Sequence, residues 1–168
     1  RSAYPDVEVR LHELAPNRQL AGLENHSLHA GFMTASFLSP PKELVMVRLA
    51  SWPMLLAVPG NHALARKKKV TVDMLKDEPF IAYAGEDYES AAMMRFIAGF
   101  RPNIAYEASR ISIIAAMVDA GVGVGLVPAW LNKSMVRFSV AYKTVEEITA
   151  CMEYSLVYRK DDESPLLG

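Results

Sequence analysis

Residues 111–130 read ISIIAAMVDAGVGVGLVPAW and carry the patterns of a helix, a turn and a strand in succession. Four apolar residues recur at the i, i+3, i+4, i+7 spacing of one buried helical face. They are Ile111, Ile114, Ala115 and Val118. Gly121 then suits the left-handed residue that commonly follows a helix, and the apolar run 122–127 predicts a strand covered on both faces. Pro128 should end that strand because proline has no N–H to donate, so the stretch predicts one helix–strand unit inside a layered α/β domain.

Gly121, Gly123 and Gly125 stand at alternate positions, as glycines do in some nucleotide-binding loops. The dinucleotide fingerprint places a strand before its glycines and a helix after them, so that the helix N-terminus meets the pyrophosphate. Here the order is reversed, and Leu126 stands where the third glycine should be. The small residues are therefore expected to allow close helix–strand packing rather than to bind a phosphate.

Strand and helix patterns alternate along the rest of the chain, which predicts an α/β fold with mostly parallel pairing. Helices are expected to begin at Pro16 and at Ser90, the second running to Gly99. Pro53 should separate two strands, because it cannot donate to a central ladder. The expected strands are 7–11, 30–33, 44–49, 54–58, 80–83, 104–108, 136–140, 142–145 and 150–159.

The 168 residues are 51% hydrophobic and carry a formal net charge of −1. That is enough chain for one sizeable core, or for two small lobes that share strands. A near-neutral chain argues against a nucleic-acid-binding surface, and the basic run 66–69 is expected to be solvated. Cys151 is the single cysteine, so no intramolecular disulfide can form and a reducing cytoplasm fits. No apolar stretch reaches about 18 residues, so no membrane span is expected.

Reactive residues show no spacing that supports catalysis or metal binding. His26 and His29 lie three apart, but no cysteine or clear acidic partner completes a metal site, and His12 and His62 stand alone. Nucleophile contexts such as Gly-x-Ser-x-Gly are absent. The nine methionines are spread along the chain and are expected to fill the core. We therefore expect no enzyme, no metal and no cofactor.

Six segments, taken in order and at their spacing, resemble the effector-binding domain of LysR-type transcriptional regulators over nearly the whole chain. The resemblance implies an α/β fold similar to type 2 periplasmic binding proteins, in which two lobes are joined by two crossing strands and a small molecule binds between them. By this analogy residues 1–50 and 151–168 form the first lobe, and residues 51–150 form the second. The matching segments are YPDVEVRLHEL (4–14), QLAGLENHSLHAGFM (19–33), LLAVPGNHALA (55–65), VDMLKDEPFI (72–81), ISIIAAMVDAGVGVGLVPAW (111–130) and YSLVYRKDDESPLL (154–167).

The chain departs from the family pattern at both ends. It contains neither the DNA-binding winged helix nor the linker helix, and it lacks the first strand and helix of the effector domain and most of its last helix. It also has no initiator Met, so we expect it to be part of a longer protein. The effector site should then be incomplete, and apolar surface that those elements would cover should be exposed.

The resemblance also implies which residues contact the effector, because the family uses loops at strand ends between the lobes. Some relatives that bind carboxylates have a hydroxyl near Pro16 and an arginine near Thr34, and this chain has neither. Glu86 and Asp87 place negative charge where a helix N-terminus would otherwise favour an anion, so a neutral or cationic effector, or none, is expected. Alternatively, both acids only complement the helix dipole from solvent. The implied contacts are Pro16, Asn17, Thr34, Gly85, Glu86, Asp87, Val127 and Pro128.

The function implied is ligand sensing within a bacterial transcription regulator in the cytoplasm. The full-length protein would be a homodimer or tetramer, with strand 7–11 and its neighbouring helix near the interface, and it would bind DNA only through a domain absent from this chain. One alternative is a solute-binding protein of the same fold that delivers a ligand to a transporter. Another is an enzyme on this fold, such as a dehydratase-like relative, for which Glu86, Asp87 and Thr34 form no recognisable catalytic set.

Overall fold

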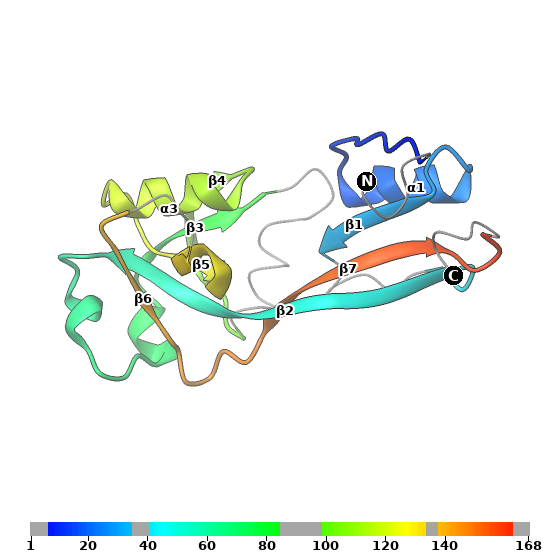
Figure 1. Cartoon of the computed structure of the whole chain (residues 1–168). Helices are drawn as coiled ribbons and strands as arrows, with labels where there is room; N and C mark the ends of the chain where they lie inside the picture. Colours follow the sequence, from blue (N-terminus) through cyan, green and yellow to red (C-terminus); the bar gives the residue numbers. More distant parts are fainter. Residues whose placement is uncertain (1–6, 35–40, 85–98, 134–137, 163–168) are drawn as a thin grey trace.

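The computed structural model describes residues 7–34, 41–84, 99–133 and 138–162, which form two lobes joined by two long strands (Figure 1). The first lobe contains α1, β1 and the paired parts of β2 and β7, and the remaining elements form the second lobe. In chain order the elements are α1 (Pro16–Glu24), β1 (Ala30–Thr34), β2 (Leu44–Pro59), the 3-10 turns η1 (Ala63–Arg66) and η2 (Val72–Leu75), β3 (Pro79–Tyr83), β4 (Asn103–Ala108), α3 (Ile111–Asp119), β5 (Gly125–Pro128), η3 (Ala129–Lys133), β6 (Val140–Lys143) and β7 (Cys151–Arg159).

The two lobes are connected by the ribbon that β2 and β7 form. These strands pair antiparallel from Leu44 opposite Arg159 to Pro53 opposite Cys151. From Met54 onward β2 pairs instead with β5 and β6. The expectation that Pro53 separates two strands is therefore wrong, since β2 runs unbroken for 16 residues. The strand tolerates this proline because its missing N–H falls where β2 changes partners.

The first lobe is a sheet in the order β1–β7–β2, with α1 packed on one of its faces. Leu23 of α1 is fully buried against this face, together with residues from all three strands. Their buried members are Met33, Leu44 and Val157. On the opposite face Phe32 and Val47 are aligned across the sheet through Leu156, and they are 52% and 41% exposed. This sheet face therefore exposes apolar side chains.

The second lobe has a core on each side of its strands. One cluster includes Leu56 and Phe80, and the other packs α3 against Val127 and its neighbours. Gly123 and Gly125 allow this close packing, because a Cβ at Gly123 would lie 2.4 Å from the Pro79 carbonyl oxygen. The packing interpretation of these glycines is thus confirmed.

Two other expectations about strands are wrong. Residues 7–15, all of them described, form no strand, and Val9 and Leu11 are 59% and 87% exposed. An alternating segment becomes a strand only beside a partner, and β1 is paired only with β7 among the described strands. Pairing is also mostly antiparallel, with β3–β4 as the parallel pair of named strands. The chain crosses between the lobes in opposite directions along β2 and β7, which makes the central pairing antiparallel.

The helix and turn of the 111–130 unit are confirmed. Helix α3 covers Ile111–Asp119, Gly121 has φ of 75°, and β5 ends at Pro128. The strand begins at Gly125 rather than at residue 122. The expected helix from Ser90 lies largely outside the described residues, and the residue limits of the two lobes stay a prediction.

Candidate functional site

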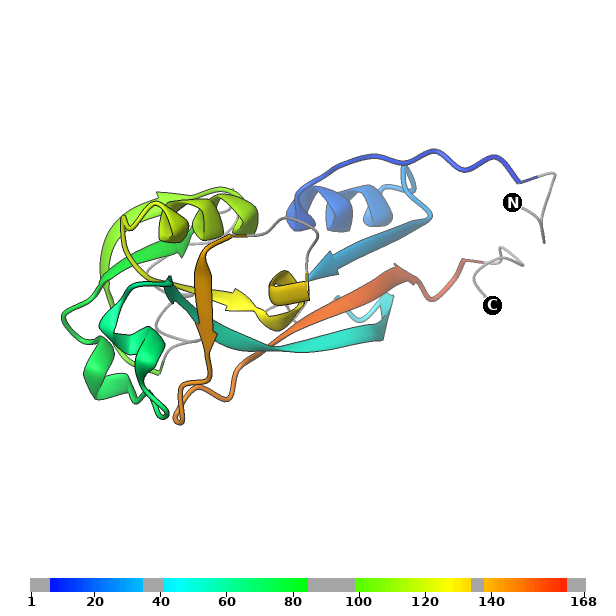
Figure 2. The same ribbon diagram turned by 60° about the vertical axis from the view of Figure 1, so that its left-hand side comes forward.

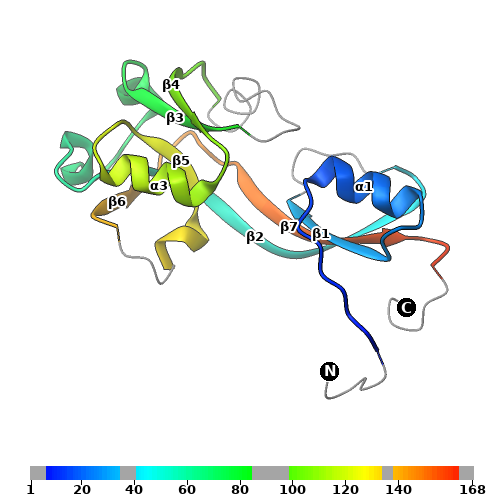
Figure 3. The ribbon, with the colours of Figure 1, turned by 90° about the horizontal axis from the view of Figure 1, so that it is seen from above.

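The N-termini of α1 and α3 face each other across the boundary between the lobes (Figures 2 and 3). Glu13, two residues before the α1 N-cap Ala15, has its Oε1 atom 3.6 Å from Nη2 of Arg110. Arg110 is itself the N-cap of α3. Neither helix start has a side-chain cap or an acidic residue in its first turn. Two helix ends that each carry positive partial charge are thereby brought to one place.

Pro16, Asn17 and Thr34 lie at element ends on the first-lobe side of this boundary. Pro16 is the first residue of α1, as its fixed φ favours, and the Asn17 side chain accepts a hydrogen bond from the Arg18 amide. Thr34 is the last residue of β1 and pairs with Tyr154. The amino end of α1 and the carboxyl end of β1 both point toward the second lobe (Figure 2). The structure therefore places these three residues at the same side of the first lobe.

Val127 and Pro128 lie on the second-lobe side. Pro128 pairs with Met54, the first residue of β2 after its change of partner, so β5 ends at the lobe boundary. The Val127 side chain is fully buried and packs with Ile114 and Val118 of α3. Its side chain belongs to the second-lobe core, which leaves only its backbone available to a ligand. Gly85, Glu86 and Asp87 lie outside the described residues.

Sequence reasoning missed Glu13 and Arg110, which join the lobes at the helix ends. One signal was present: Arg110 precedes an apolar helix, although a cation at a helix N-terminus is electrostatically unfavourable. Ser109 before it would have been the expected cap. A residue that breaks this preference often has a partner from elsewhere in the fold, and here the partner is Glu13.

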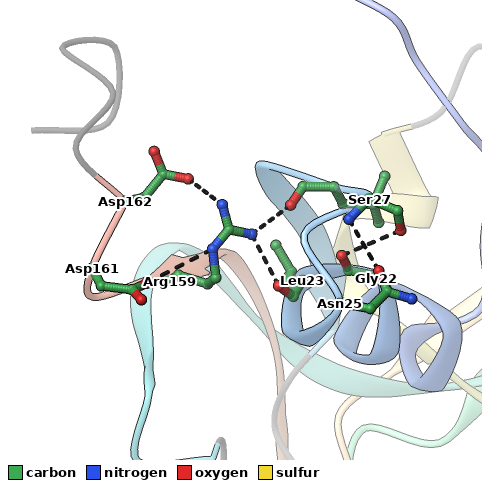
Figure 4. Close-up of polar contacts among 8 residues, drawn as sticks. Gly22, Leu23, Asn25, Ser27, Arg159, Asp161 and Asp162 are labelled. Atoms are coloured by element: carbon green, nitrogen blue, oxygen red, sulfur yellow. Dashed lines mark hydrogen bonds and ion pairs between the residues drawn. The ribbon is translucent and has the colours of Figure 1, made fainter.

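Sequence reasoning also missed Arg159, which fixes the other end of α1 (Figure 4). Its side chain is 10% exposed, and Nη1 donates to the carbonyl oxygens of Leu23 at 2.9 Å and Leu28 at 2.7 Å. Nη2 lies 2.6 Å from Oδ2 of Asp162, which is 6% exposed. Carbonyls at a helix C-terminus lack helical partners, and a cation there complements the dipole. Arg159 thus ties α1 to β7 and sets where the amino end of α1 lies.

His62 and His26 both lie in local turns. His62 Nδ1 accepts a hydrogen bond from the Leu64 amide at 3.2 Å, and its Nε2 lies 3.4 Å from Glu78. His26 has φ of 62° in the turn after α1. Within the described ranges, no group of three or more His, Cys, Asp or Glu side chains could hold a metal ion.

The charged surface of the second lobe carries local ion pairs. Lys69, in the basic run 66–69, pairs with Glu146 at 2.8 Å, and this hydrogen bond raises the pKa of Lys69. Hydrogen bonding from Lys76 likewise lowers the pKa of Asp73. Residues 66–69 are all exposed, which agrees with the expectation that the basic run is solvated. In the part of the chain that is described, no helix is long and apolar enough to cross a membrane.

Family and sequence comparisons with known proteins point to the same family. The profile of the LysR substrate binding domain matches residues 1–167. The HTH-type transcriptional regulator AlsR of Bacillus subtilis is 32% identical over 174 residues, covering 99% of this chain and 56% of that protein. The chain spans about half the length of the regulators that it matches in sequence.

Solved structures agree with the fold. The effector binding domain of BenM with its effector benzoate superposes with a TM-score of 0.81 at 23% identity, covering 99% of this chain and 77% of that one. A BenM variant of the same domain gives a TM-score of 0.83 at 22% identity, with coverage of 99% and 79%. The expected fold, similar to type 2 periplasmic binding proteins with two lobes and two crossing strands, is therefore confirmed. The chain belongs to the LysR substrate binding domain family.

Proposed function

We propose that this chain is the ligand-sensing domain of a bacterial transcription regulator that binds a small-molecule effector between its two lobes. The match to the LysR substrate binding domain over residues 1–167 carries this proposal. The named relatives in sequence are transcriptional regulators, which favours this function over transporter delivery. The domain would then regulate transcription rather than catalyse a reaction, and it would act in the cytoplasm.

The effector would bind where the two helix N-termini approach each other. Pro16 and Asn17 begin α1, Thr34 ends β1 and Pro128 ends β5, so four of the expected contacts lie at the lobe boundary. Gly85, Glu86 and Asp87 complete the proposed contact set, and Val127 would contribute through its backbone. Backbone N–H groups at the start of α3 would supply hydrogen-bond donors to a polar effector group, and the positive end of the α1 dipole would add to their attraction.

The mechanism would be a shift in the population of lobe arrangements. An effector that contacts both lobes favours the arrangement in which those contacts can form together. The lobes are joined by β2 and β7, so a small change in the ribbon alters how they lie relative to each other. In the full-length protein this change would alter a homodimer or tetramer and the geometry of a DNA-binding domain outside this chain.

A thermal-shift screen of the 168-residue chain tests the proposal. The probes are benzoate, which is the effector of BenM, other aromatic acids, amino acids and neutral analogues. A probe at 100 times its dissociation constant should stabilise the folded chain by about 2.7 kcal/mol. A folded sample that responds to none of them would count against effector sensing by this chain.

Variants then locate the site of any probe that binds. Thr34→Arg should abolish the shift caused by a neutral or cationic probe, because it places a long cation at the end of β1 beside the proposed effector position. Thr144→Arg is the matched control, since Thr144 is an exposed threonine that follows β6 in the second lobe. Binding that survives Thr34→Arg would contradict the proposed contact set while leaving effector sensing intact.

A further inference from the structure

We infer that Glu13 and Arg110 form an electrostatic latch that favours the arrangement in which the two helix N-termini lie close together. Glu13 belongs to the extended segment before α1 in the first lobe, and Arg110 is the N-cap of α3 in the second. Their Oε1 and Nη2 atoms are 3.6 Å apart. The contact therefore joins the lobes directly, in addition to the covalent ribbon. The consequence for effector binding rests on the proposed function, whereas the effect on lobe separation does not.

A change in the arrangement of the lobes should have a large effect on the distance between Glu13 and Arg110. The lobes are covalently joined along β2 and β7, and α1 and α3 both lie on one side of that ribbon (Figure 1). A bend of the ribbon moves the two helix ends apart or together, as in hinge motions between domains. The Glu13–Arg110 distance thus reports the arrangement, and the attraction between the charges biases it.

The charge of Arg110 explains why Glu13 matters at this position. A cation at the start of a helix is repelled by the positive end of the helix dipole. Helix α3 has no acidic residue in its first turn to offset this repulsion. Glu13 supplies the missing negative charge from the other lobe, but only when the lobes are close. Separation of the lobes therefore removes the negative charge of Glu13 from Arg110.

The exposure of both side chains sets the strength of the latch. The Arg110 and Glu13 side chains are 68% and 89% exposed, so solvent and salt screen the pair strongly. Exposed ion pairs of this kind change an equilibrium by about two- to threefold. The pair would tune the balance between lobe arrangements without locking it. Its contribution should be lost at high ionic strength, because the Debye length falls to about 3 Å at 1 M salt.

Spin-label distance measurements on the 168-residue chain test the latch without any effector. Cys151→Ser removes the exposed native thiol, and Glu24→Cys and Lys68→Cys place one label on each lobe at exposed positions. Glu13→Arg should move the distance distribution toward the separated arrangement and change the ratio of the two populations by about threefold or more, since attraction becomes repulsion. Glu13→Arg with Arg110→Glu should return the distribution to that of the parent, because the swap restores opposite charges.

The pair Glu8–Arg10 provides the matched control. It is an exposed ion pair of 2.9 Å within the same extended segment, but it joins residues of one lobe. Glu8→Arg should leave the distribution unchanged, whereas 1 M salt should shift the parent in the same direction as Glu13→Arg. A Glu13→Arg distribution identical to that of the parent, or a charge swap that fails to restore it, overturns the latch. Neither result bears on the effector screen, and a negative screen leaves this measurement unaffected.

Discussion

Arg159 is the residue on which the position of α1 depends. It is a buried cation whose two terminal nitrogens donate to fixed acceptors: the carbonyl of Leu23 in α1, the carbonyl of Leu28 in the turn that follows, and the carboxylate of Asp162. A buried charge is stabilising only when such partners are complete. Since α1 carries Pro16 and Asn17 at its other end, a single side chain at the carboxyl end of β7 helps to set the geometry of the proposed effector site.

Arg159→Met should lower the free energy of unfolding by about 3 kcal/mol, because it removes the guanidinium that pairs with the buried Asp162 carboxylate and donates to two carbonyl groups. Chemical denaturation of the 168-residue chain measures this loss. Arg48→Met is the matched control, since Arg48 pairs with Glu153 at 3.1 Å on the same ribbon but is 65% exposed. That substitution should cost less than about 1 kcal/mol. Equal losses in the two variants would contradict the role assigned to Arg159.

Elements with local signals could be predicted from the sequence. The 111–130 stretch is predicted well because its helical period, Gly121 and Pro128 act on their own neighbours. The start of α1 at Pro16 is predicted for the same reason. The candidate positions at the ends of α1, β1 and β5 follow once these elements are recognised through the family resemblance.

Elements that depend on distant partners could not be predicted in this way. Whether Pro53 stops a strand depends on which strands flank β2 at that point, and those strands come from the other end of the chain. Residues 7–11 alternate correctly but have no strand beside them. The contact of Glu13 with Arg110 likewise requires both lobes in place. A linear pattern contains none of this spatial information.

Gly123→Ala tests how closely the helix–strand unit is packed. The added Cβ would lie 2.4 Å from the carbonyl oxygen of Pro79, a backbone atom of β3 that cannot move aside alone. We expect a loss of about 1 to 3 kcal/mol in the free energy of unfolding, which is the usual cost of overpacking. Gly125→Ala should cost less, because its closest contact is the Cγ2 atom of Ile114, at 2.6 Å. A larger loss for Gly125→Ala would show that the side chain, not the backbone, limits this packing.

At the scale of the whole molecule, the two lobes bury their cores to different extents. The second lobe has a buried cluster on each side of its strands, while the first has one cluster beneath α1. Its other sheet face presents Phe32 and Val47, and Phe32 stacks on Tyr154 with ring centroids 6.2 Å apart. Apolar side chains aligned across three strands form a continuous surface rather than scattered exposed residues.

This face predicts how the isolated 168-residue chain behaves toward a dye that binds apolar surface. Phe32→Thr with Val47→Thr should lower ANS fluorescence, because both substitutions keep strand-compatible residues while removing exposed apolar area. The free energy of unfolding should change by no more than about 1 kcal/mol per substitution, since each loses only cross-strand contacts. Met74→Thr is the control: Met74 is 42% exposed on η2, away from this sheet, and its loss should leave the signal nearly unchanged. If the control lowers fluorescence as much as the double substitution, the dye binds elsewhere, and the sheet face is not the dominant apolar surface of the molecule.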